Sequence, residues 1–514
     1  MSGTGRAWRR VQRTGRKTSL EVRRWGRSTH RQVRHLYLRA RREVRPLEHE
    51  VRTFPRRAVA SSRTWVDVTA GDARHGDLRA VAVLLLVVTF ALLPLQNVRL
   101  TSGAAAADLS LALAAVVAIV SRHRRPPAEP LPPLIRNGIV LMALGGFVGL
   151  VFADEALVSA KLLVRLLAVA LLAVVAVVRV APSGREVRRF LVAFVIAGAV
   201  SGAVSALGDL TGAPLLDRST FGDRAVGLTL LPYPLIDYLR GTTAAAQSIA
   251  INPNLFGGVS AVGGALAVTL LVEATSSRLR LVLAAATGGL FLGVLFSGSR
   301  SALLALLVGC VPAVWRLVRR GFGRRVLIGA GIVGVLVVLS MVTTVRAPSL
   351  DRLLLRPGSA DSERTAESTI LRYQNATRGL EERGWHSLAT GSGLRDDAPS
   401  KLHDGHLEIW VGLGLIGLVG WALLCFGIIE GGVRYAGRAG PLRVHEVALL
   451  AIASAFAANV MVTLFVDTIW NRYIWLLVAL FITLLIRPQG VGAPLISGPA
   501  DATTDEPVPE LVTA

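Results

Sequence analysis

A series of long apolar runs limits what this chain can fold into. Each run is close to the ~20 residues that a helix needs to cross ~30 Å of hydrocarbon. Only 18% of the residues are charged, whereas a soluble domain has about 25%. We therefore expect an all-α polytopic membrane protein with about 12 transmembrane helices. The expected spans are 79–98, 104–121, 135–152, 157–180, 188–208, 249–272, 279–297, 301–318, 325–346, 405–430, 446–466 and 469–486.

The charges between these spans alternate and predict an orientation. Cytoplasmic connections of membrane proteins carry an excess of Lys and Arg. With the N-terminus inside, every second connection should be basic, and each of them is. We therefore expect both termini on the cytoplasmic side of the cytoplasmic (inner) membrane, with long outer loops over 209–248 and 347–404. The basic connections are 122–125, 185–189, 278–280, 316–325 and 434–443.

The chain is expected to have three parts. Residues 1–77 form a basic cytoplasmic arm, in which residues 1–57 carry 18 Lys or Arg against four acids, a local net charge of +14. This arm either lies on anionic lipid headgroups or only enforces the orientation. Nucleic-acid binding is not expected, because the positive-inside rule already explains the charge. Residues 78–487 form the transmembrane domain, and the Pro-rich segment 488–514 is expected to be a disordered cytoplasmic tail.

A histidine lies where the second long loop enters the tenth span. On a continuous helix of 100° per residue, Gly414 lies about 20° and Gly417 about 40° from His403. Glycines on one helix face let a neighbouring helix approach closely. An imidazole with a pKa of about 6.5 held there can take a proton from a hydroxyl group. The alternative is an interfacial histidine that caps the helix.

Four sequence elements, in order, resemble the signature of the O-antigen ligase and O-antigen polymerase superfamily. The best of them is His403, one short polar residue, nine residues, and then Gly414-Leu415-Ile416-Gly417, although Asp404 replaces the usual Asn, Ser or Gln. The other three are Asn252-Pro253-Asn254-Leu255-Phe256, Ser297-Gly298-Ser299-Arg300-Ser301-Ala302, and Leu371-Arg372 followed by Gly391-Ser392-Gly393.

The resemblance implies a GT-C-type glycosyltransferase, with 78–487 as its catalytic domain. It would transfer a polyprenyl-pyrophosphate-linked glycan, such as one on undecaprenyl pyrophosphate, to a glycan acceptor hydroxyl at the outer face, without a metal or other cofactor. His403 is the expected general base. Arginines bind phosphates through bidentate hydrogen bonds, so Arg300 and Arg372 are the expected pyrophosphate ligands. Arg218 and Arg224 in the first outer loop are further candidates.

Other interpretations remain open. Arg300 can instead be a snorkelling residue at a helix end, and the loop arginines can be solvated charges. Lys161 and Arg165 lie one turn apart in the fourth span, and such a pair is costly unless it faces a cavity, here one along the lipid path. The main alternative function is a transporter or flippase of lipid-linked oligosaccharide, followed by a peptidoglycan-type polymerase and an inactive scaffold. Polymerase and ligase share the four elements. The abundance of Ala, Val, Gly, Leu and Arg is typical of a GC-rich bacterial genome. Many such bacteria lack the lipopolysaccharide core that a ligase would need, so a polymerase is favoured.

Overall fold

The computed structural model describes residues 78–95, 106–121, 129–211, 253–297, 299–323, 374, 377–395, 405–438, 440–466 and 471–486. The chain divides into two compact units, Met1–Gly71 and Asp72–Ala514, and all the described residues belong to the second. The basic arm, the C-terminal tail, the predicted span 325–346 and most of both outer loops lie outside these ranges.

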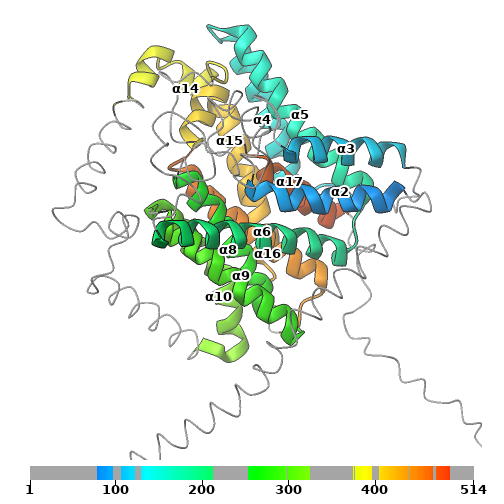
Figure 1. Cartoon of the computed structure of the whole chain (residues 1–514). Helices are drawn as coiled ribbons and strands as arrows, with labels where there is room; N and C mark the ends of the chain where they lie inside the picture. Colours follow the sequence, from blue (N-terminus) through cyan, green and yellow to red (C-terminus); the bar gives the residue numbers. More distant parts are fainter. Residues whose placement is uncertain are drawn as a thin grey trace, which may run out of the picture. The chain divides into compact units, whose positions relative to one another are not determined.

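Every regular element in the described ranges is a helix (Figure 1). The absence of strands there agrees with the predicted all-α class. In chain order the elements are α2 (Leu78–Leu92), η1 (Leu93–Leu95), α3 (Ala106–Val120), α4 (Pro133–Val151), α5 (Ala156–Val180), α6 (Gly184–Thr211), α8 (Pro253–Val272), α9 (Ser277–Phe296), α10 (Arg300–Leu317), η5 (Val318–Phe322), α14 (Ser387–Thr390), α15 (Gly405–Val433), α16 (Val444–Thr463) and α17 (Arg472–Ile486).

The helix lengths are those of a multi-pass membrane protein. Within the described ranges, eight helices are long and apolar enough to cross a membrane, namely α4, α5, α6, α8, α9, α10, α15 and α16. Three further apolar helices, α2, α3 and α17, have 15 residues each. At 1.5 Å per residue they cover about 22 Å, less than the ~30 Å of a hydrocarbon core. Eleven predicted spans thus coincide with apolar helices, and the twelfth, 325–346, lies outside the described ranges.

The predicted boundary between the seventh and eighth spans is confirmed. Ser299 precedes α10 in an extended conformation, and its side chain accepts a hydrogen bond from the amide of Ala302. Ser276 caps α9 in the same way. A serine in this position satisfies one of the amides that a helix start leaves free. The serine-rich segment therefore separates two helices that an apolar run alone would have joined.

Glycines bring α4 and α15 into backbone contact. A methyl group at Gly145 would lie 2.5 Å from the amide nitrogen of Gly417, and one at Gly138 would lie 2.7 Å from that of Leu424. One at Gly149 would lie 2.3 Å from the Gly412 oxygen. Small residues allow this approach in membranes, where helix association depends on packing rather than on the hydrophobic effect. The expected close approach at Gly417 is therefore confirmed, with α4 as the partner helix.

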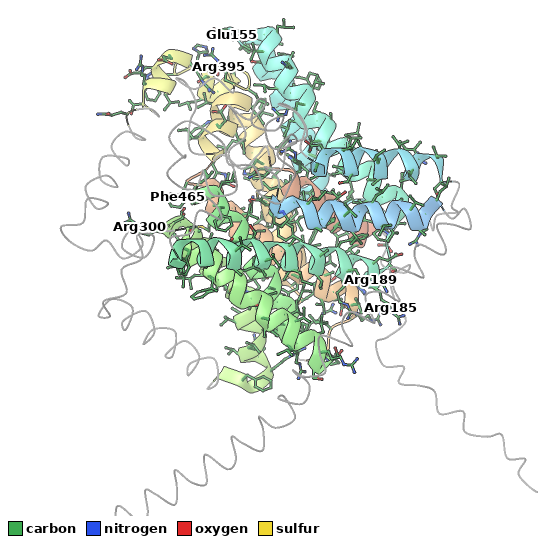
Figure 2. The ribbon with its side chains drawn as sticks, in the orientation of Figure 1. Glu155, Arg185, Arg189, Arg300, Arg395 and Phe465 are labelled. Carbon is green, nitrogen blue, oxygen red and sulfur yellow. The ribbon has the colours of Figure 1, made fainter. Side chains whose placement is uncertain are left out.

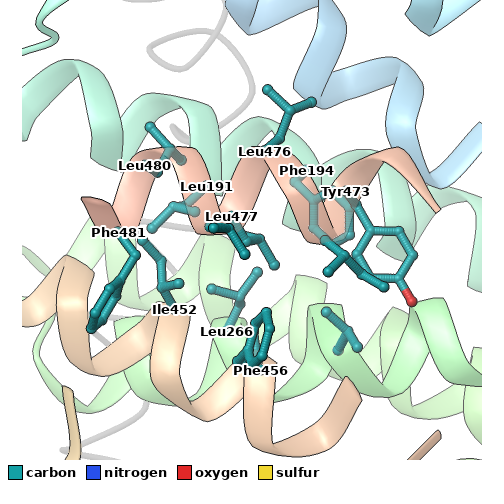
Figure 3. Close-up of a cluster of buried hydrophobic side chains, with 14 of the residues drawn as sticks. Leu191, Phe194, Leu266, Ile452, Phe456, Tyr473, Leu476, Leu477, Leu480 and Phe481 are labelled. Carbon is teal, nitrogen blue, oxygen red and sulfur yellow. The ribbon is translucent and has the colours of Figure 1, made fainter. Parts of the chain in front are cut away.

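The centre of the bundle lies around α16 and α17. Figure 3 shows apolar side chains of α6, α8, α16 and α17 in contact there. Most of α16 is buried, as expected of a helix that is apolar on all sides. Its one amide side chain, Asn459, accepts a hydrogen bond from the buried hydroxyl of Tyr473 at 2.9 Å. This core holds the helix ends on which the candidate site is built.

Contacts between helix termini define two ends of the bundle. At the first, which we call the arginine-rich end, α2 and α6 begin and α8 and α10 finish. At the second, which we call the loop end, α3, α8, α10, α15 and α17 begin. Figure 2 shows Arg185 and Arg189 away from Arg300 and Phe465 of the loop end. The joining contacts are Arg79–Glu186 and Arg316–Glu273 at the first end, and Arg472–Asp108 and Arg395–Asp154 at the second.

Candidate functional site

One of the five predicted site residues lies within the described ranges. Arg300 is the first residue of α10, at the loop end, and its side chain is exposed. It forms no ion pair with an acidic residue in the described part of the chain. His403, Arg372, Arg218 and Arg224 lie outside the described ranges. We therefore describe the candidate site from the described residues of the same motif elements and from the helices that contain them.

Gly414 interrupts the helix that follows His403. Its φ of 67° and ψ of −174° are not helical, and only glycine adopts such a conformation readily. The indole nitrogen of Trp421 donates to Nδ1 of His406 at 3.0 Å, although 15 residues would rise about 22 Å along a straight helix. The two parts of α15 therefore fold against one another, and the expectation of one continuous helical face from His403 to Gly417 is wrong.

The Gly391-Ser392-Gly393 element lies at this interruption. The amide of Ser392 donates to the Val411 oxygen at 2.9 Å, and the amide of Gly393 donates to the Gly412 oxygen at 3.1 Å. These bonds satisfy carbonyls that the interrupted helix leaves without a partner. Gly391 and Gly393 both have positive φ, which favours glycine. Two motif elements that are about twenty residues apart thus form one backbone contact.

Tight packing explains why this contact needs glycine. A methyl group at Gly391 would lie 2.8 Å from the Gly412 oxygen and 2.9 Å from the Cα of Gly149. One at Gly414 would lie 2.6 Å from the Gly391 amide nitrogen. Residues 377–395, the described part of the predicted second outer loop, are called the outer segment below. This segment, α15 and the end of α4 therefore meet backbone to backbone.

A buried ion pair, which the sequence alone did not indicate, joins the outer segment to α15. Arg383 contacts Glu408 at 3.3 and 3.4 Å, and both side chains are almost fully buried. The indole nitrogen of Trp410 also donates to the Leu388 oxygen at 2.8 Å. The available signal was Glu408 itself, the only acidic residue between Gly405 and Ile429. An acid in an apolar run requires a partner.

His406 has a structural role. Its Nδ1 accepts from Trp421 and its Nε2 lies 3.0 Å from the Val460 oxygen. An indole only donates and a carbonyl only accepts, so the proton is on Nε2 and the lone pair of Nδ1 is occupied. His406 therefore has no free nitrogen with which to accept a proton from a substrate.

The Ser-Arg element packs at the loop end against α8, the helix that contains most of the Asn252–Phe256 element. A methyl group at Gly257, in the first turn of α8, would lie 2.5 Å from the Ser297 hydroxyl oxygen. Ser297 accepts from the Ser299 amide at 3.1 Å, and the hydroxyls of Ser299 and Ser301 lie 2.9 Å apart. These hydrogen bonds order the start of α10, while the Ser297 side chain lies against α8. The helix that follows Asn252-Pro253 thus packs directly on the Ser-Arg element.

The last turn of α16 connects the two pairs of elements. Its Val460 oxygen contacts His406 of α15, and a methyl group at Gly258 of α8 would lie 2.6 Å from a methyl carbon of Val462. The starts of α8, α10 and α15 therefore gather around one end of the bundle. Helix starts carry partial positive charge, so this end suits an anionic ligand.

Lys161 and Arg165 are both exposed on α5. Neither forms an ion pair with an acid in the described ranges. Their position along the lipid path stays a prediction. The described residues also contain no group of three His, Cys, Asp or Glu side chains that could hold a metal ion.

Comparison with known proteins gives no family for the chain. No protein-family model matches it, and no curated protein matches it. We therefore base the function on the motif residues and on the contacts between their elements at the loop end.

Proposed function

We propose that this protein is a membrane glycosyltransferase that transfers a polyprenyl-pyrophosphate-linked glycan to a sugar hydroxyl at the outer face of the cytoplasmic membrane. One observation carries the proposal. Gly257, the residue after the Asn252–Phe256 element, contacts Ser297 of the Ser-Arg element, and Gly391 of the third element contacts Gly412 within the His403–Gly417 element, both at one end of the helical bundle. Elements that build a single site are expected to converge in this way, whereas chance matches have no reason to do so.

The chemistry requires a base and a stabilised leaving group. The acceptor oxygen attacks the anomeric carbon of the donor sugar, and the bond from that carbon to the pyrophosphate oxygen breaks. The pyrophosphate leaves with the electron pair, and His403 takes the hydroxyl proton. His403 precedes α15 by two residues, and two residues span at most about 7 Å.

Fixed positive charge stabilises the departing pyrophosphate. Arg300 at the start of α10 supplies a guanidinium fork, and the starts of α8, α10 and α15 supply partial positive charge at the same end. Arg372, Arg218 and Arg224 are further proposed ligands from the outer loops. The loop end faces outward in this proposal, and the arginine-rich end faces the cytoplasm in agreement with the positive-inside rule.

A flippase of lipid-linked oligosaccharide is the second candidate, because transporters use interrupted helices to bind substrates and ions. The interruption at Gly414 is such a feature. In transporters the unwound carbonyls bind the ions, whereas here the Val411 and Gly412 oxygens accept from Ser392 and Gly393. The occupied carbonyls favour the transferase.

The test is transfer by the purified protein in vesicles that contain an undecaprenyl-pyrophosphate-linked repeat unit. A transferase releases undecaprenyl pyrophosphate and forms longer glycans, or glycosylates an added acceptor if it is a ligase. A flippase moves the intact lipid across the bilayer and releases nothing. Transbilayer movement without release would reject the proposal.

A further inference from the structure

One face of α5 is exposed along most of the helix and carries large apolar side chains. Leu157, Val164 and Leu171 are 85%, 65% and 63% exposed. Lys161 and Arg165 are exposed among them. The opposite face is buried, because α5 packs there against α3 and α17. Exposed apolar side chains on a helix of this length mark a face that lies against hydrocarbon in a membrane.

The two cations lie next to one another on this face. Lys161 and Arg165 are four residues apart, so they differ by about 40° around the helix axis, and their Cβ atoms are about 5–6 Å apart. Neither forms an ion pair with an acid in the part of the chain that the structure describes, and the nearby Asp154 binds Arg395 at 2.7 Å. Two like charges side by side on a lipid-facing surface are costly unless an anion joins them.

The length of α5 places both cations near one end of the span. Arg179 lies on the same face in the last turn of α5, and residues 166–178 carry no charge. At 1.5 Å per residue, Arg165 lies about 21 Å and Lys161 about 27 Å from Arg179, against ~30 Å of hydrocarbon. The Cα–Cβ bonds of a helix tilt toward its N-terminus, and α5 begins at the loop end. Both long side chains therefore extend to the headgroups at that end.

We propose that Lys161 and Arg165 bind the phosphate of an anionic phospholipid in the membrane leaflet at the loop end. The guanidinium of Arg165 matches two phosphate oxygens at once, and the ammonium group of Lys161 donates to the same phosphate. Val164 and Leu171 lie deeper on the same face and contact the acyl chains. Charge complementarity selects an anionic lipid, because the cation of a zwitterionic headgroup would be repelled by the two side chains. The inference goes beyond the proposed transfer and does not depend on it.

A bound lipid is expected to stabilise the folded protein measurably. The start of α5 is held to the outer segment, since the Ser159 hydroxyl donates to the Leu394 oxygen at 3.0 Å and Asp154 binds Arg395. The proposed site lies within two turns of these contacts. A ligand that binds only the folded state raises the unfolding midpoint in proportion to its occupancy of the site. Thermal unfolding therefore reports lipid binding here.

The experiment titrates lipids separately into the purified full-length protein in a neutral detergent and follows the midpoint of thermal unfolding. The lipids are phosphatidylglycerol, zwitterionic phosphatidylcholine and undecaprenyl pyrophosphate. We expect phosphatidylglycerol to raise the midpoint at lower concentration than phosphatidylcholine. The double variant Lys161→Gln/Arg165→Gln should raise the half-maximal phosphatidylglycerol concentration by about tenfold or more, because it removes charge-assisted hydrogen bonds. The matched control is Arg136→Gln/Arg278→Gln, which removes the same charge from two exposed arginines on separate helices, α4 and α9.

Each outcome decides the proposal. Weakening by the double variant and not by the control supports the site. Equal weakening by both would show a nonspecific effect of net charge and reject it, as would equal effects of the two phospholipids or no effect of phosphatidylglycerol. Stabilisation by undecaprenyl pyrophosphate that depends on Lys161 and Arg165, where phosphatidylglycerol does not, would assign the face to the proposed donor and overturn the phospholipid site.

Single variants keep the test decisive if the double variant does not fold. Lys161→Gln and Arg165→Gln should each raise the half-maximal phosphatidylglycerol concentration by about threefold or more, since each removes one partner of the phosphate. Unchanged binding in both would reject the proposal. Because the readout is binding, the result is independent of transfer activity.

Discussion

Gly414 shows how one residue decides the geometry of the proposed site. It has positive φ, and its Cα lies so close to the Gly391 backbone that no side chain fits. The sequence motif already singled out Gly414, but as a contact point on a straight helix. Helical-wheel geometry assumes helical φ and ψ at every residue, so it cannot predict an interruption that another segment of the chain stabilises.

Replacing Gly414 with Ala should destabilise the protein. A residue with a side chain in this backbone region costs on the order of 1–3 kcal/mol, and the new methyl group would lie 2.6 Å from the Gly391 amide nitrogen. Thermal unfolding in detergent measures the effect. Gly288→Ala is the matched control, because nothing lies within 4 Å of the methyl group it adds to α9. Equal midpoints for the two variants would contradict the tight contact.

The Arg383–Glu408 pair should matter far more than an exposed pair next to it. Glu408→Gln removes the carboxylate that contacts the buried Arg383, and breaking a buried pair costs about 3–5 kcal/mol. Glu382→Gln breaks the exposed Arg378–Glu382 pair, which is worth about 0–1 kcal/mol. Chemical unfolding of both variants is the measurement. A similar loss for both would show that the buried pair does not anchor the outer segment.

Arg300 is predicted to act through the shape of its guanidinium. Lys keeps the charge but loses the two parallel hydrogen bonds to phosphate. Arg300→Lys should therefore impair transfer nearly as much as Arg300→Ala, while the exposed side chain makes a folding defect unexpected. Turnover of the lipid-linked substrate is compared at equal protein level. Full activity of Arg300→Lys would leave only a general electrostatic role.

At the scale of elements, the sequence predicts the helices better than their contacts. Apolar length located α9 and α10, because this signal is local, and the structure adds a serine cap at the start of each helix. The contact between Gly391–Gly393 and the interruption of α15 is not local, and neither segment alone indicates its partner. The pairing of Arg383 with Glu408 was missed for the same reason. The family-like motif marked several of these residues without giving their geometry.

At the scale of the whole molecule, the alternation of apolar runs and basic connections anticipates which helix ends come together. The Arg79–Glu186 and Arg395–Asp154 pairs each join ends that the alternation assigns to one side. Because each apolar span is long enough to cross the membrane, successive helix ends alternate between its two sides. Counting the spans therefore predicts the side on which each end lies. Counting does not give the positions of His403 or Arg372, which depend on the fold of the outer loop.

The orientation of these two ends is testable by cysteine labelling in intact cells. In a background with Cys310 and Cys425 replaced by Ala, a membrane-impermeant reagent should modify Ser400→Cys and not Ser19→Cys. The loop end then faces outward and the basic arm lies inside. Labelling of Ser19→Cys alone would invert the topology and remove the proposed site from the outer face.

The most direct test of the central claim is transfer by the His403→Ala variant. A general base contributes typically about 10²–10⁴-fold, so His403→Ala should lose transfer by that factor while retaining the wild-type unfolding midpoint. His386→Ala, which changes an exposed histidine of the outer segment, should keep its activity. The measurement is release of undecaprenyl pyrophosphate from a lipid-linked repeat unit in reconstituted vesicles, at equal protein level. Wild-type release by His403→Ala, or an equal loss in His386→Ala, would contradict the proposed chemistry.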